Sequence, residues 1–114
     1  MRRNGIPKTL QIAGLTWAVK LRAKILLKGE RCDGLCRPLE QDILLDRENV
    51  ARNDRARKNL LHEGLHALFA DRPVYFDDEA LIELLEERLD EFIRLNPRFF
   101  ALYDYKLQKR PHAR

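Results

Sequence analysis

The chain has 114 residues, of which 45% are hydrophobic and 35% are charged, and its formal net charge at pH 7 is +4. This length accommodates one domain with a modest core, since domains commonly run to about 100–150 residues. The mixture of apolar and charged residues excludes an intrinsically disordered chain, and no apolar run reaches the roughly 20 residues that span a bilayer.

The N-terminus begins Met1-Arg2-Arg3 but lacks the apolar stretch that follows the basic start of a signal peptide. We therefore expect a cytoplasmic protein with no membrane partner. Basic residues also gather between Arg52 and Lys58 and from Lys106 to Arg114. We interpret residues 1–114 as a single domain with basic tails at about 1–7 and 106–114. The tails carry no interleaved aromatic residues that stack on bases, so only weak nucleic-acid association is expected.

Residues 8–46 show the alternation of apolar and polar side chains that is typical of strands. Thr9 to Ile12 and Leu15 to Leu21 flank Ala13-Gly14, which predicts a β-hairpin with a glycine turn. Three further segments follow in chain order: a strand at Ala23–Leu27, a glycine-containing loop at Lys28–Pro38 and a strand at Gln41–Asp46. Three or four strands are thus expected, and we predict that they form a small antiparallel sheet.

Two cysteines lie in the predicted loop, as Cys32-Asp33-Gly34-Leu35-Cys36. A zinc ribbon or a redox pair is one interpretation. A ribbon needs a second pair of Cys or His ligands, and the only histidine outside the central pair is His112 in the tail. We therefore expect two reduced thiols in a loop.

The second half of the chain has helical periodicity. Apolar residues recur at spacings of three and four from Asn53 to Ala70, which predicts an amphipathic helix that ends at Asp71-Arg72-Pro73. A second helix is predicted to begin at Asp77 or Asp78 and to run to Leu95, before Asn96-Pro97. Its expected apolar face comprises Leu81, Ile82, Leu85, Leu89, Phe92 and Ile93. A short element around Phe99, Phe100, Leu102, Tyr103 and Tyr105 is expected to pack against the core.

The first helix contains His62-Glu63-Gly64-Leu65-His66. Residues four apart lie one turn above each other, so His62 and His66 can present two imidazole nitrogens to one metal ion. Glu63 points about 100° round the helix from His62, which keeps its carboxylate off the metal but within reach of a water molecule there. This spacing predicts a zinc site with Glu63 as the general base.

Catalytic zinc usually takes three protein ligands, so a third donor is expected. Glu79 is favoured, because it lies in the first turn of the second helix and the connection at 71–76 can fold the helices together. Glu83, one turn further on, is the alternative ligand. Otherwise its carboxylate would accept the free ring N–H of a histidine ligand. We interpret the remaining acids of this helix as a solvated edge: Glu86, Glu87, Asp90 and Glu91.

A helix with His-Glu-x-x-His followed by a glutamate-bearing helix resembles the gluzincin metallopeptidases. More narrowly, residues 8 to 97 resemble the small phage and prophage zinc peptidases related to the ImmA/IrrE group, through Asp42–Asp46, Asn59–Leu68, Asp78–Leu85 and Asn96-Pro97. The resemblance implies a zincin-like α+β fold with a strand-rich half against two helices. It also implies zinc held by His62, His66 and Glu79, with Glu63 as the base. Gly64 departs from a good helix former and costs about 1 kcal/mol relative to alanine.

These residues together predict a zinc-dependent metallopeptidase, a hydrolase that acts on a protein or peptide substrate. The oxyanion donor stays open among Tyr75, Tyr103, Tyr105 and His112. Two alternatives stand beside this prediction. One is a zinc-stabilised module that binds protein or DNA without catalysis, and the other is a protease that acts on DNA-associated proteins. The sequence predicts no oligomeric state.

Overall fold

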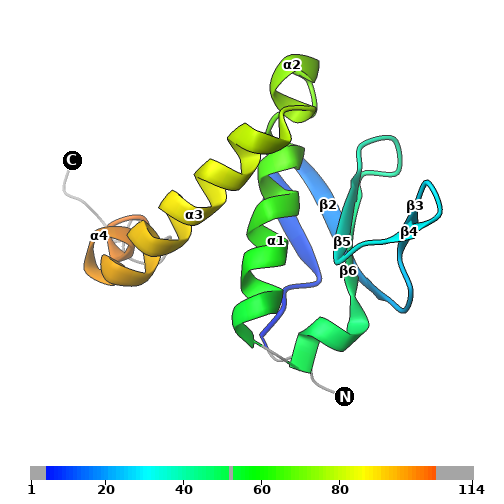
Figure 1. The fold of residues 1–114 in the computed structure, drawn as a ribbon. Helices are drawn as coiled ribbons and strands as arrows, with labels where there is room; N and C mark the ends of the chain where they lie inside the picture. Colours follow the sequence, from blue (N-terminus) through cyan, green and yellow to red (C-terminus); the bar gives the residue numbers. More distant parts are fainter. Residues whose placement is uncertain (1–4, 52, 105–114) are drawn as a thin grey trace.

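The computed structural model describes residues 5–51 and 53–104, which form an α+β fold with a small mixed sheet and four α-helices (Figure 1). The predicted α+β class is confirmed. The strands are β1 (Thr9–Ile12), β2 (Leu15–Arg22), β3 (Leu26–Leu27), β4 (Glu30–Arg31), β5 (Gly34–Arg37) and β6 (Asp42–Asp46). The helices are the 3₁₀ helix η1 (Arg47–Ala51), α1 (Asn53–Leu68), α2 (Pro73–Phe76), α3 (Glu79–Leu95) and α4 (Pro97–Ala101). Within the described ranges, no helix combines the length and apolarity needed to cross a membrane.

The predicted hairpin is confirmed as β1 and β2, which pair antiparallel with Thr9 opposite Ala18 and Ile12 opposite Leu15. The two turn residues, Ala13 and Gly14, have φ values of 52° and 81°. Two consecutive residues with positive φ give the turn a twist that matches the twist of the strands. Glycine adopts this conformation without steric strain, which explains Gly14.

The main sheet has the order β1-β2-β6-β5, in which β6 runs parallel to β2 and antiparallel to β5. The prediction of an antiparallel sheet is therefore wrong for this central pair. The chain leaves β2, forms the β3–β4 hairpin and returns through β5, so that it enters β6 in the direction of β2. Side-chain alternation is the same in both kinds of pairing and carries no information about strand direction.

The predicted loop at residues 28–38 contains two strands, β4 and β5. β5 forms an edge of the main sheet, with Gly34 opposite Leu45 and Cys36 opposite Ile43. Four residues that begin with glycine give too little periodicity for a strand to be predicted, and pairing with β6 determines their conformation. The strand expected at Ala23–Leu27 shortens to the two residues of β3.

The core lies between the sheet and α1, which covers one face of the sheet (Figure 1). Trp17 and Val19 of β2 and Ile43 and Leu45 of β6 are at most 3% exposed. They pack in one cluster with Ala67 of α1 and other apolar residues. Full burial of a side chain such as Ile43 contributes about 1.5–3 kcal/mol, so this layer fixes α1 on the sheet.

The predicted helix pair is confirmed as α1 and α3. Asp78 caps α3, because its Oδ1 accepts a hydrogen bond from the Leu81 N–H at 3.0 Å. The first half of α3 packs on α1 and buries Ile82 completely. Its second half projects away from the sheet (Figure 1), so the predicted core residues Phe92 and Ile93 are 45% and 43% exposed.

The short element predicted after Asn96 is α4, which packs on the end of α3 through ring contacts of Phe92 with Phe99 and Phe100. The expectation that it packs against the sheet core is wrong. Tyr105 and the predicted tail at residues 106–114 lie outside the described residues, as does most of the predicted N-terminal tail.

Asp90 on α3 is 6% exposed and is not part of a solvated edge, contrary to the prediction. Its Oδ1 accepts a hydrogen bond from Nε of Arg57 on α1 at 2.8 Å, and its Oδ2 accepts one from Nε of Arg94 at 3.2 Å. These hydrogen bonds, that from Arg57 foremost, hold the pKa of Asp90 below its ordinary value despite burial. The pair joins α1 to the middle of α3.

Candidate metal centre

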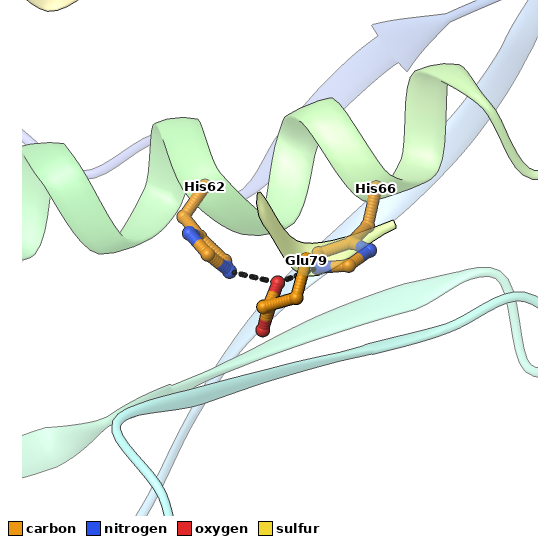
Figure 2. A group of neighbouring side chains, drawn as sticks. All are labelled: His62, His66 and Glu79. Carbon is orange, nitrogen blue, oxygen red and sulfur yellow. Dashed lines mark hydrogen bonds and ion pairs between the residues drawn. The ribbon is translucent and has the colours of Figure 1, made fainter. Parts of the chain in front are cut away.

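The two histidines of α1 and the first residue of α3 converge at one point (Figure 2). Oε1 of Glu79 lies 3.0 Å from Nε2 of His62 and 2.9 Å from Nε2 of His66. The spacing of four residues places both rings on one face of α1. The connection through α2 then turns the chain so that α3 begins beside them. The structure thus brings together the three residues that the sequence predicted as ligands, with their ligand atoms within 4.8 Å of one another.

The other nitrogen of each ring has its own acceptor. Nδ1 of His62 lies 2.8 Å from Oε1 of Glu86, and Nδ1 of His66 lies 2.8 Å from the carbonyl oxygen of Phe76. A carboxylate and a carbonyl only accept hydrogen bonds, so both Nδ1 atoms carry the proton. In the neutral rings, Nε2 is therefore the unprotonated nitrogen, the form in which histidine binds a metal.

This assignment leaves three electron pairs directed at one another: one on each Nε2 and one on Oε1 of Glu79. Such an arrangement is stable only if protons or a cation lie between them. The pKa of His62 shows that its surroundings favour a positive charge on the ring. Burial lowers it, but the hydrogen bond to Glu86 and the charges of Glu63, Glu79 and Glu86 together raise it above its ordinary value. Two imidazoles and one carboxylate are a donor set that zinc accepts, so the residues present fit the ion.

Glu63 lies beside the ligands and is 9% exposed. No hydrogen bond or ion pair of its carboxylate is found among residues 5–51 and 53–104. Burial raises its pKa from 4.5 to about 7, the charges of His62 and His66 oppose this rise, and those of Glu79 and Glu86 add to it. The carboxylate is thus held near the candidate ligands, and no arginine or lysine of the described residues pairs with it.

Gly34 of β5 explains how Glu63 fits against the sheet. A Cβ atom at this position would lie 3.1 Å from Cγ and 3.2 Å from Oε2 of Glu63, and 3.1 Å from the Leu44 carbonyl oxygen. Glycine therefore lets the glutamate pack directly on the strand backbone. Gly64 differs, because a Cβ there would meet nothing within 4 Å. No close approach explains this glycine in the helix.

A cavity of about 630 Å³ opens beside the ligands, between α1, β5 and the residues around α2. Leu35 and Phe76 contribute apolar walls, and Glu63 faces the same space. Asn59, one turn before Glu63 on α1, also lines the cavity, and its Nδ2 is buried without a hydrogen-bond partner within the described ranges. The cavity is large enough for several residues of a peptide.

The hydrogen bond to a histidine that the sequence analysis assigned to Glu83 is formed by Glu86. Glu83 is exposed, whereas the side chain of Glu86 is 18% exposed and was wrongly interpreted as part of a solvated edge. The signal that could have identified Glu86 is its spacing of seven from Glu79, which puts both residues on one face of α3 two turns apart.

The cysteines are free thiols, as predicted, but Cys36 lies in β5 and packs in the core. Burial foremost, and then Glu63 and Asp42, raise its pKa to about 12, so the thiol stays protonated and is a poor metal ligand. Of the candidate oxyanion donors, Tyr75 packs against Phe69, and Tyr103 contacts Phe99 beyond α3. Tyr105 and His112 lie outside the described residues.

No protein-family model, curated protein or solved structure matches this chain. The resemblance to gluzincins and to the ImmA/IrrE group therefore stays a prediction from the residues.

Proposed function

We propose that this chain is a zinc-dependent peptidase, in which His62, His66 and Glu79 hold the ion and Glu63 is the general base. The observation that supports this most strongly is the convergence of Nε2 of His62 and Nε2 of His66 on a carboxylate oxygen of Glu79. Beside them lies Glu63, which is 9% exposed and has no hydrogen bond or ion pair among residues 5–51 and 53–104. Three protein ligands leave one position open on a four-coordinate zinc ion. An open position distinguishes catalytic zinc sites from structural ones.

A bound zinc ion would supply Lewis-acid chemistry and lower the pKa of a water molecule to about 7. Glu63 accepts the proton of the attacking water at its carboxylate and passes it to the leaving amine, as a general base and then a general acid. A nearby divalent cation would lower the pKa of Glu63 from its value of about 7. The carboxylate would then be ionised at neutral pH and able to accept that proton. Because Gly34 has no side chain, the carboxylate of Glu63 has room to stay beside the proposed ligands.

Glu86 and the Phe76 carbonyl orient the two imidazoles through their Nδ1 protons. The substrate side of the cavity is formed by β5, whose backbone edge away from β6 has no partner strand in the described part of the sheet. An extended peptide can pair with such an edge through its own main chain. This arrangement would hold a peptide bond near Glu63.

The test compares wild type with Glu63→Gln on a broad peptide library at neutral pH, with zinc content measured by elemental analysis. Both proteins should hold close to one zinc per chain, while hydrolysis by the variant falls by about 10²–10⁴-fold. Glu87→Gln, an exposed acid of α3 that does not line the cavity, is the matched control and should keep full activity. If wild type and Glu63→Gln hold zinc and neither differs from the other in any cleavage assay, a non-catalytic binding module replaces the peptidase.

A further inference from the structure

The cavity beside the candidate ligands carries more negative charge than one zinc ion would neutralise. Its described lining includes four acidic residues and neither lysine nor arginine; the acids are Asp33, Glu63, Asp77 and Glu79. Four formal negative charges and one divalent cation leave a net charge of −4 + 2 = −2. The whole chain has a net charge of +4, so the negative charge of the cavity is a local feature and does not reflect the overall composition.

Arg31 and Arg37 flank the part of the chain between them that lines the cavity. They do not neutralise its acids, because both form ion pairs with other carboxylates. Arg37 donates two hydrogen bonds to Asp42, at 2.8 and 2.7 Å. Nζ of Lys20 also lies 3.0 Å from Oδ2 of Asp42. Arg31 pairs with Asp46 and Glu48. Lys20, Arg31 and Arg37 thus each face a buried acid, Asp42 or Asp46, and the acids of the cavity keep their charge available for a ligand.

Two of the cavity acids lie on either side of the reactive centre. Asp33 immediately precedes Gly34, and Oδ1 of Asp33 is 3.4 Å from Nδ2 of Asn49, on the 3₁₀ helix that leads into α1. Asp77 follows Phe76, whose carbonyl oxygen contacts His66 near the other end of α1. Neither carboxylate has an ion-pair partner in the part of the chain that the structure describes. Glu63, 9% exposed and equally unpartnered, faces the cavity between them.

We propose that the preferred substrate is a cationic peptide in extended conformation, with a lysine or arginine side chain on each side of the scissile bond. Asp33 and Asp77 recognise these two side chains, while the peptide bond lies near Glu63. This inference rests on the proposed function and adds the chemical class of the substrate. Because Asp33 and Asp77 are both exposed, the recognition is electrostatic and weakens with salt.

The experiment measures binding of three fluorescein-labelled short peptides to the zinc-loaded Glu63→Gln protein by fluorescence anisotropy. The peptides share one apolar centre and differ only in the flanking residues, which are lysine, glutamine or glutamate. At about 50 mM salt we expect the lysine peptide to bind about tenfold tighter than the glutamine peptide and the glutamate peptide to bind weakest. The difference should shrink at about 500 mM salt.

Variants then test whether Asp33 and Asp77 cause the preference for the lysine peptide. Asp77→Asn and Asp33→Asn, each in the Glu63→Gln background, should each reduce the lysine preference about two- to fivefold, and the double variant should abolish it. Asp77→Asn removes only the charge of an exposed side chain. It therefore still tests the recognition if Asp33→Asn disturbs the contact of Asp33 with Asn49. Glu87→Gln removes the same charge outside the cavity and should leave the preference intact.

Equal binding of the three peptides, or a lysine preference that survives in the double variant, would overturn this inference. If wild type still cleaves peptides in a Glu63-dependent manner, the proposed function stands in both cases. If the zinc-loaded protein binds none of the peptides and wild type cleaves nothing in the library, both proposals fail together.

Discussion

Helices α1 and α3 are joined at two places, and the two joints differ in chemistry. At one joint, Arg57 of α1 provides a permanent charge and hydrogen-bond donors to the buried Asp90 of α3. At the other, Nε2 of His62 and Nε2 of His66 lie 3.0 and 2.9 Å from Oε1 of Glu79. The first joint is complete within the protein, whereas the second needs protons or a cation between its electron pairs. Buried acids with arginine partners are structural, and a buried acid beside an incomplete donor set indicates a reactive site.

The largest expected effect comes from breaking the metal joint. Glu79→Gln replaces a ligand and should weaken zinc affinity by more than about 100-fold, whereas Glu86→Gln, which only orients His62, should weaken it by about 10–100-fold. Glu83→Gln is the matched control on the same helix and should have no effect. Competition with a chromophoric zinc chelator gives the three affinities. A larger effect of Glu83→Gln than of Glu86→Gln would show that the sequence-based assignment was correct after all.

Breaking the arginine joint should destabilise the fold without changing zinc binding. Asp90→Asn leaves Arg57 and Arg94 without their carboxylate, which should lower the free energy of unfolding by about 1–3 kcal/mol. Urea denaturation of the metal-free protein measures this loss, and zinc titration of the same variant should give the wild-type affinity. A variant with normal stability but weaker zinc binding would mean that the two joints are not independent.

The pH dependence of the metal-free protein should also separate the joints. The pKa of Glu63 is raised from 4.5 to about 7, so the folded state binds an extra proton between these values and loses stability as pH rises through them. His62, whose pKa is raised above 6.5, adds a loss at higher pH. The lowered pKa of Asp90 gives the opposite sign, because its contribution disappears as pH falls below 3.8.

Melting temperatures of metal-free wild type and Glu63→Gln across this range test the assignment. The variant should gain stability relative to wild type above about pH 7 and show no gain near pH 4, since glutamine cannot ionise. Parallel melting curves at every pH would exclude Glu63 as the titrating group.

The smallest effects come from two glycines, Gly34 of β5 and Gly64 of α1. Gly34→Ala introduces a Cβ 3.1 Å from Cγ of Glu63, which should destabilise the protein by about 1 kcal/mol or more. Gly64→Ala adds a Cβ with open space around it and should stabilise α1 by about 1 kcal/mol. Gly64 lines an apolar groove with Arg57 and Asp90, whereas Glu63 lines the cavity beside the histidines. Thermal unfolding of both variants gives the two signs, and the same sign for both would contradict the contact between Gly34 and Glu63.

The sequence predicted the parts of the site that depend on helical spacing alone. The shared face of His62 and His66 follows from the helical repeat of α1, and the predicted start of the second helix at Asp77 or Asp78 agrees with Asp78 as the cap of α3. The choice between Glu83 and Glu86 depends on how α3 crosses α1, which side-chain periodicity does not record. Periodicity likewise identified Phe92 and Ile93 as an apolar face but could not show that α3 projects beyond the sheet at that point.

The strands show the same division between local and non-local information. The hairpin turn at Gly14 has a local signal, whereas β5 exists because β6 pairs with it. The sequence therefore predicts a loop at Gly34 and carries no signal for the contact of this residue with Glu63. The parallel pairing of β2 and β6 also depends on the path of the chain between them.

The short connection through α2 would give Glu79, the proposed third ligand, an advantage over a free carboxylate in solution. Glu79 lies 13 residues beyond His66 and is tethered to the helix that carries both histidines. Its carboxylate therefore meets them at an effective concentration in the millimolar range, about that of a short tether. Two histidines on one helix hold a metal weakly and release it readily. A tethered carboxylate would let an ion that has dissociated from one ligand be bound again before it escapes. The residence time of a bound metal would then depend on the tether as well as on the ligands.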